Sequence, residues 1–157
     1  MKVEYLGNKE LLNMPKTAFL ASRTIPPDMV LRCYDWATTK HEGCVVSGFS
    51  SKLEQDVLHF LLKAKRPVIL VLARRLYCNT PEELREPIEQ GRLLLISNTN
   101  SPRQTRATAQ IRNKYVCNIS DKVLIVTANS KSSLAPLLEE FKSKLLLVGG
   151  SSLTTIT

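Results

Sequence analysis

The sequence lacks the short motifs that mark several large enzyme classes. None of the patterns G-x-G-x-x-G, G-x-x-x-x-G-K-[ST], G-x-S-x-G and H-E-x-x-H occurs in its 157 residues. A dinucleotide cofactor, a P-loop nucleotide hydrolase, a serine hydrolase and a zinc protease are therefore not indicated. The two histidines, His41 and His59, belong to no Ser-His-Asp set, and no pair of carboxylates suggests acid–base catalysis. These absences favour a binding protein over an enzyme, without a cofactor or a metal ion.

Paired cysteines and long apolar runs are also missing. The longest apolar run, residues 68–73, is too short to cross a bilayer, and the N-terminal MKVEYLGNKELL has no apolar signal region. The cysteines form no C-x-x-C pair, so zinc and redox motifs are unsupported. They are Cys33, Cys44, Cys78 and Cys117. We expect a cytoplasmic protein with no membrane association, in which Cys33 and Cys44 are buried, reduced thiols.

The charge is unbalanced, and aromatic residues are few. The chain has 22 basic and 14 acidic residues, a formal charge of +8, and 6% aromatic residues. The positive charge favours anionic partners, above all nucleic acid or nucleotides, although few side chains are available to stack on bases. Length and a hydrophobic content of 43% predict a single domain over residues 1–157. Residues 1–15 are expected to pack on it as a lead-in, and 149–157 to fray or add an edge strand.

Strand-like and helix-like segments alternate along the chain. Short apolar runs predict strands over residues 16–22, 44–46, 68–73, 92–97, 122–128 and 145–148. Helical spacing and proline positions predict helices after Pro26 and after Ser51, and over residues 81–90, 106–120 and 133–144. Alternation of this kind implies parallel pairing through right-handed crossovers. The sequence therefore predicts an α/β, Rossmann-like fold of three layers, with helices on both faces of a mostly parallel sheet of about six strands.

A small-residue turn lies between the second predicted strand and its helix. It consists of Ser47, Gly48, Phe49, Ser50 and Ser51. Such a turn faces the positive end of the following helix, where hydroxyl and backbone N–H groups favour a phosphate or a carboxylate. The alternative is an ordinary turn with a serine N-cap and no ligand. Glu54 is expected to be a solvated glutamate in the first helical turn.

Arginines recur in the loops that follow the predicted strands. These loops are residues 22–24, 47–51, 74–75 and 98–106, and three of the four contain arginine. Ligands of open α/β sheets bind beyond the carboxyl ends of the strands, so the loops predict an anion site. Arg23 is expected to grip a phosphate there, and Arg74, Arg103 and Arg106 to widen the site into a basic track.

Several motifs resemble those of one family, in the same order. Residues 5–23 (YLGNKELLNMPKTAFLASR) resemble the entry segment of DNA-processing protein A (DprA/Smf), Ser47-Gly48 its Ser-Gly turn, and Arg112-Asn113-Lys114 its Arg-Asn-Arg helix. The resemblance covers residues 5–148, within a wider group that includes the LOG proteins. It implies a Rossmann-like domain that binds single-stranded DNA, forms a homodimer and helps to load a recombinase during DNA uptake. The matching site residues are Ser22, Arg23, Ser47, Gly48, Arg112 and Asn113.

The chain also departs from the family pattern. Ala21 replaces a glycine, Lys52-Leu53-Glu54 replaces Gly-Ile-Asp, and the Pro-Gly-Gly-x-Gly-Thr motif of LOG proteins is missing, which argues against phosphoribohydrolase activity. Three functions therefore stay open at this point. The first is a module for single-stranded nucleic acid, with phosphate contacts from the matching residues and the turn. The others are a site for a nucleotide or nucleotide-derived molecule, with or without hydrolysis, and a degenerate interaction subunit.

Overall fold

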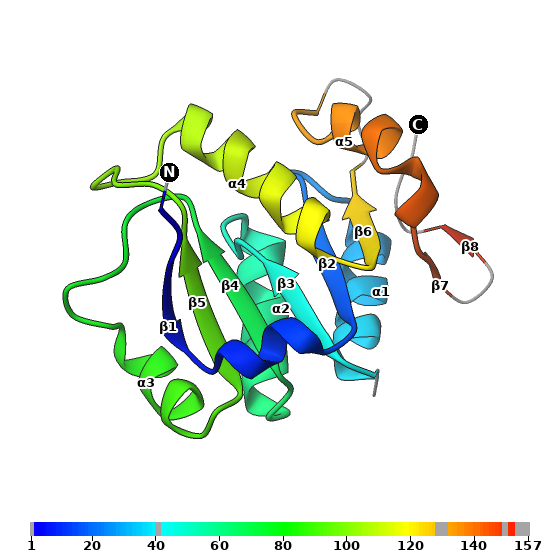
Figure 1. Ribbon diagram of the computed structural model, residues 1–157. Coiled ribbons are helices and arrows are strands. Elements are labelled where there is room, and N and C mark those ends of the chain that lie inside the picture. The colour runs from blue at the N-terminus through cyan, green and yellow to red at the C-terminus, as the bar shows by residue number, and fades with distance from the viewer. Residues whose placement is uncertain (1, 40–41, 128–131, 149–150, 153–157) are drawn as a thin grey trace.

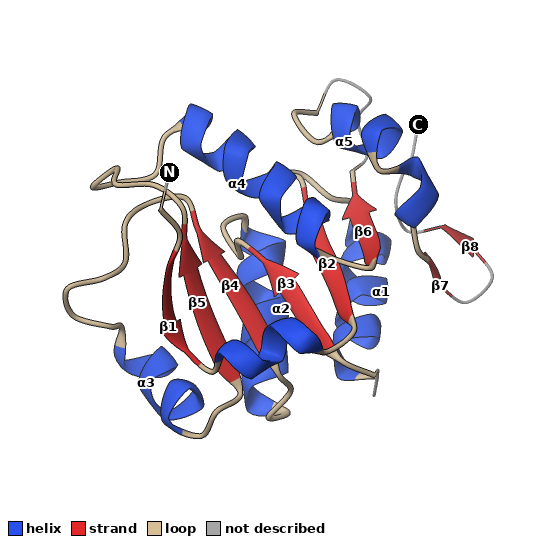
Figure 2. Cartoon of the chain, viewed as in Figure 1, coloured by secondary structure: helices blue, strands red, loops and turns tan. Residues whose placement is uncertain are grey.

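A single six-stranded sheet forms the centre of the molecule. The computed structural model describes residues 2–39, 42–127, 132–148 and 151–152. The strand order is β1-β5-β4-β3-β2-β6, and every pairing is parallel except that of β1 with β5. The strands are β1 Glu4–Gly7, β2 Lys16–Ala21, β3 Cys44–Ser47, β4 Val68–Leu72, β5 Leu93–Ser97 and β6 Lys122–Val126. The predicted three-layer, mostly parallel α/β fold is confirmed (Figures 1 and 2).

Helices cover both faces of this sheet. They are η1 Lys9–Asn13, α1 Pro27–Thr38, α2 Lys52–Lys63, α3 Glu82–Glu89, α4 Arg106–Ile119, α5 Ala135–Glu140 and η2 Lys142–Lys144. Apolar side chains of α1, α2 and α3 pack on one face, and those of η1, α4 and α5 on the other. Among the described residues, none of these helices is both long and apolar enough to span a bilayer.

The core explains why the apolar runs become central strands. All five residues of β4 are buried, and its side chains alternate between the two faces: Leu70 and Leu72 pack toward α1 and α2, whereas Ile69 and Val71 pack toward α4. A strand covered on both sides needs a continuous apolar sequence. On the α1 face, Trp36 stacks on Phe19 of β2 at 5.3 Å between ring centroids, as expected for a core tryptophan.

The connections place five loops at one edge of the sheet. The chain passes from β2 through β3 and β4 to β5 in one direction, and α4 then carries it back to β6 on the other side of β2. Because these five strands are parallel, their carboxyl ends meet at the same edge. The direction of winding reverses at β2, and ligands of such folds bind at the point of reversal.

Both ends of the chain differ from expectation. The lead-in supplies η1 and the antiparallel edge strand β1, which no apolar run announces. The expectation that residues 145–148 form a strand of the main sheet is wrong. Leu145 makes one isolated bridge with Val123, and β7 (Leu147–Val148) pairs with β8 (Ser151–Ser152) in a separate antiparallel pair. A short apolar run specifies a strand but not the strand with which it pairs. Here β7 pairs with β8, the next strand along the chain. Residues 153–157 of the expected tail lie outside the described residues.

The cysteines provide a test of this packing. Burial raises the pKa of Cys33 and of Cys117 to about 12 and that of Cys44 to about 11, whereas Cys78 is exposed. Raised pKa values keep the three buried thiols protonated and unreactive, since the thiolate is the nucleophile. We expect one thiol per folded molecule to react rapidly with a chromogenic disulfide reagent, and all four after denaturation.

The variant Cys78→Ser is the control, because it should abolish the rapid reaction and leave the fold intact. Rapid modification of a second thiol in the folded protein would contradict this packing.

Candidate functional site

Loops from neighbouring strands interlock at the carboxyl edge of the sheet. We call the described loop residues 22–24, 48–51, 73–75 and 98–105, together with Arg106 at the start of α4, the rim. Gln104 Nε2 donates to Ser50 Oγ at 3.0 Å, which joins the loop after β5 to the turn after β3. The backbone N–H of Arg75 donates to the carbonyl of Ser101 at 2.8 Å, which joins the loop after β4 to the same segment. Three of the four loops of the rim are therefore joined by hydrogen bonds.

Several polar groups of the turn after β3 make hydrogen bonds within the protein. Ser47 is completely buried, and its hydroxyl accepts a hydrogen bond from the backbone N–H of Phe49 at 3.0 Å. Phe49 has a φ of +47° and is 5% exposed, so its ring belongs to the core on the α2 face. A left-handed phenylalanine is unfavourable by itself, and burial of the ring offsets that cost. Ser47 and Phe49, both expected at a ligand, thus shape the turn from inside.

Glu54 is the buried centre of this region. Its Oε1 accepts the backbone N–H groups of Ser50 at 2.7 Å and Ser51 at 3.1 Å, and its Oε2 accepts that of Ala21 at 2.8 Å. The Ser51 hydroxyl accepts the N–H of Glu54 at 3.3 Å, which completes a capping box for α2. The side chain is 5% exposed, so the expectation of a solvated glutamate is wrong. A carboxylate at this depth persists because its oxygens are hydrogen-bonded.

Arg112 reaches the turn from α4, on the opposite face of the sheet. It is 3% exposed, and its Nε donates to Asn113 Oδ1 at 2.7 Å while Nη1 lies 3.4 Å from the carbonyl oxygen of Val71. Burial lowers the pKa of its guanidinium, and the Glu54 carboxylate opposes that shift. Arg112 and Asn113, both expected to contact a ligand, therefore engage each other within the protein.

The guanidinium of Arg112 lies so close to residue 48 that only glycine fits there. A Cβ atom on residue 48 would overlap Nη1 and Cζ of Arg112. Gly48 is not among the glycines with positive φ, so the close approach of the guanidinium, and not the backbone conformation, explains the absence of a side chain.

The other arginines that the sequence predicts at the site lie at the surface. Arg23, Arg103 and Arg106 are exposed, and Ser22 is half-buried with its N–H bonded to Val126. The guanidinium of Arg74 lies 4.6 Å from the ring centroid of Tyr77, a cation–π contact. The first turn of α4 has no acidic residue, so its positive end is not neutralised locally. This part of the rim is cationic.

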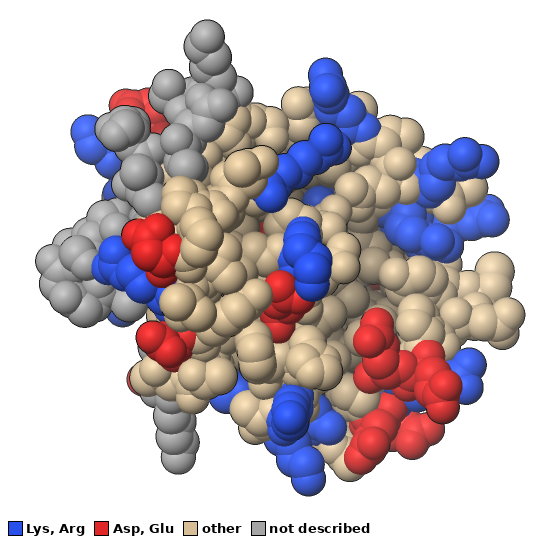
Figure 3. Space-filling view, turned by 180° about the vertical axis from the view of Figure 1, so that it is seen from behind, with Lys and Arg blue, Asp and Glu red and all other residues tan. Residues whose placement is uncertain are grey.

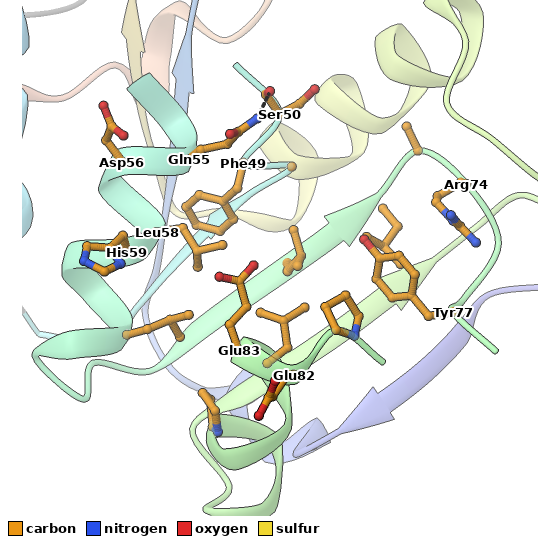
Figure 4. A pocket seen from close by; sticks show the side chains of 18 of the residues that line it. Phe49, Ser50, Gln55, Asp56, Leu58, His59, Arg74, Tyr77, Glu82 and Glu83 are labelled. Carbon is orange, nitrogen blue, oxygen red and sulfur yellow. Dashed lines mark hydrogen bonds between the residues drawn. The ribbon is translucent and has the colours of Figure 1, made fainter. Parts of the chain in front are cut away.

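Acidic side chains are concentrated elsewhere. In Figure 3, acidic side chains gather at the α3 corner, and basic side chains gather above them on the side of the loops after β4 and β5. The acids of α3 are Glu82, Glu83, Glu86 and Glu89, all exposed. Glu82, Glu83 and Glu86 line one side of a groove of about 810 Å³, which begins at the turn after β3 and lies between α2 and α3. Glu83 points into this groove, opposite Leu58 and Phe49 (Figure 4). The side of the groove formed by α3 is thus unfavourable for phosphates, whereas Lys63 and Arg92 line another part of it.

Comparison with known proteins agrees with this architecture. Residues 2–135 match the family of DNA recombination-mediator protein A. The chain belongs to that family. It is also similar to DNA processing protein A from Helicobacter pylori, with 22% identity, a TM-score of 0.71 and coverage of 96% of this chain and 75% of that one. The corresponding protein from Streptococcus pneumoniae gives 19% identity, a TM-score of 0.73 and coverage of 90% and 52%. No curated protein matches.

The sequence contained one unused signal for this site. Ser51-Lys52-Leu53-Glu54 is a capping-box pattern, which predicts that Glu54 turns back onto the backbone of the helix start. The contact of Glu54 with Ala21 and that of Gln104 with Ser50 join residues far apart in the chain, and no local pattern announces them. Within the part of the chain that the structure describes, no cluster of His, Cys, Asp or Glu could hold a metal ion.

Replacement of Gly48 by alanine tests the packing of the turn. Because Arg112 is buried, its guanidinium cannot move away from a new Cβ without losing its partners. We expect Gly48→Ala to reduce the free energy of unfolding by about 1–3 kcal/mol, the usual cost of overpacking. Chemical denaturation measures this change.

Ser50→Ala is the matched control, since it alters the same turn but removes only one exposed hydrogen bond. Equal stability of the two variants would show that the guanidinium does not need the space above residue 48.

Proposed function

We propose that the protein binds single-stranded DNA through phosphate contacts along the rim. The observation that carries this proposal is the gathering of exposed arginines from separate loops on one edge of the sheet, with the acids of α3 kept apart from them. Arg23 follows β2, and Arg103 and Arg106 follow β5. Membership of the recombination-mediator family and the single-stranded DNA binding named for the Helicobacter pylori protein support it.

The geometry of the rim suits an extended strand. From β2 to β5 the sheet spans three strand spacings, roughly 14 Å. Cations distributed over that distance match successive phosphates better than one compact group, and contacts to phosphates are insensitive to sequence. Ser22 and Ser50 add hydroxyl groups at the same edge. In this proposal the protein acts as one domain in the cytoplasm and, as the family resemblance implies, as a homodimer that cooperates with a recombinase.

Arg23 offers a direct test. Its removal should weaken binding of every oligonucleotide and make binding less sensitive to salt, since each phosphate contact on a single strand contributes roughly 0.7 to the slope of log affinity against log salt concentration. We expect Arg23→Ala to reduce the slope by about that amount. Fluorescence anisotropy with labelled oligonucleotides of different sequence, over a series of salt concentrations, measures the change.

The control is Arg85→Ala, which removes an exposed arginine from α3, outside the rim. An unchanged slope for Arg23→Ala, or an equal change in both variants, would exclude a specific phosphate contact by Arg23. Absence of salt-dependent binding by the wild-type protein would exclude the proposed function itself.

A further inference from the structure

The positive end of α2 is already occupied by an anion that belongs to the protein. A helix start of this type usually presents free N–H groups to a phosphate. Here the N–H groups of Ser50 and Ser51 donate to Oε1 of Glu54, and the N–H of Ala21 at the end of β2 donates to Oε2. The carboxylate thus takes donors from the end of β2 and from the turn before α2, as a bound phosphate would.

The charge of this internal anion is compensated from the other side of the turn. Arg112 is the buried cation of the region, and its electrostatic interaction with Glu54 opposes the effect of burial on its pKa. A phosphate that entered the turn would have to displace Glu54, which would leave the carboxylate buried without its three donors. Such a loss is strongly unfavourable in a dry environment.

We propose that Glu54 is a specificity-determining residue that excludes a single phosphate group from the turn, so that the site selects an extended polyanion and rejects a mononucleotide. The cations that remain available lie on two separate connections: Arg23 follows β2, and Arg103 and Arg106 follow β5. Only a ligand with several phosphates reaches them together. This inference rests on the proposed function for its ligand, but the state of the turn is testable without DNA.

The first experiment removes the internal anion. Glu54→Ala frees the three backbone donors and leaves Arg112 uncompensated, so the variant should be less stable than the wild type and should gain a site for small anions. We expect inorganic phosphate to raise the melting temperature of Glu54→Ala by several degrees more than that of the wild type, in comparison with chloride at equal ionic strength. Glu54→Ser, which also shortens the side chain and frees the donors but keeps a polar group, serves if the alanine variant does not fold.

The matched control is Glu83→Ala, which removes one exposed acid from α3 and changes the net charge equally. A response of Glu83→Ala equal to that of Glu54→Ala would reduce the effect to net charge and overturn the inference. Stabilisation of the wild type by phosphate to the same extent as the Glu54 variants would also overturn it.

The second experiment addresses the ligand. Thymidine monophosphate should displace a labelled oligonucleotide from the wild type at least about tenfold less effectively than an unlabelled oligonucleotide at the same total phosphate concentration. Equal displacement would overturn the selectivity. If the wild type binds no oligonucleotide, the proposed function fails, whereas a phosphate response confined to the Glu54 variants would still establish Glu54 as the internal anion.

Discussion

The organisation of the site depends on the hydrogen bonds that the buried carboxylate of Glu54 accepts. This carboxylate joins the start of α2 to the end of β2 through three backbone hydrogen bonds. The bond to Ala21 orients the end of β2, and Ser22 and Arg23 follow Ala21 directly in the chain. Because a buried carboxylate without partners is costly, the fold must keep these donors in place. The position of the exposed arginine is therefore a consequence of an interaction two residues away.

Arg112 extends this constraint across the sheet. It belongs to α4, whose other contacts lie on the opposite face from α2, and its guanidinium occupies the space above Gly48. Arg112 thus reaches from one layer of helices to the turn before α2 in the other, where the Glu54 carboxylate opposes the lowering of its pKa by burial. Gln104 adds a contact from the loop after β5. The turn thus has contacts from β2, from α4 and from the loop after β5.

Charge is distributed so that this edge and the adjacent groove differ. Arginines occupy the rim, while the acids of α3 border the groove below it (Figures 3 and 4). A polyanion is attracted along the loops and repelled from the α3 side of the groove, so this charge distribution restricts where a nucleic acid strand would lie. The net charge of +8 favours attraction of polyanions to the protein as a whole. The separation of positive from negative side chains favours the rim as the place where a polyanion is attracted.

The sequence by itself determined the order of strands and helices from residue 16 to residue 126, because apolar runs and helical spacing are local properties. It also indicated which loops would meet, since parallel strands bring their carboxyl ends together. Only the tertiary structure decided which polar residues face outward. Arg112 appears as an ordinary charged residue in the sequence, and the capping-box pattern of Glu54 announces only its bonds to the helix start. Both residues also have partners distant in the chain, Val71 for Arg112 and Ala21 for Glu54. The edge strand β1 and the pairing of β7 with β8 were decided in the same way, since a strand pattern does not specify its neighbour.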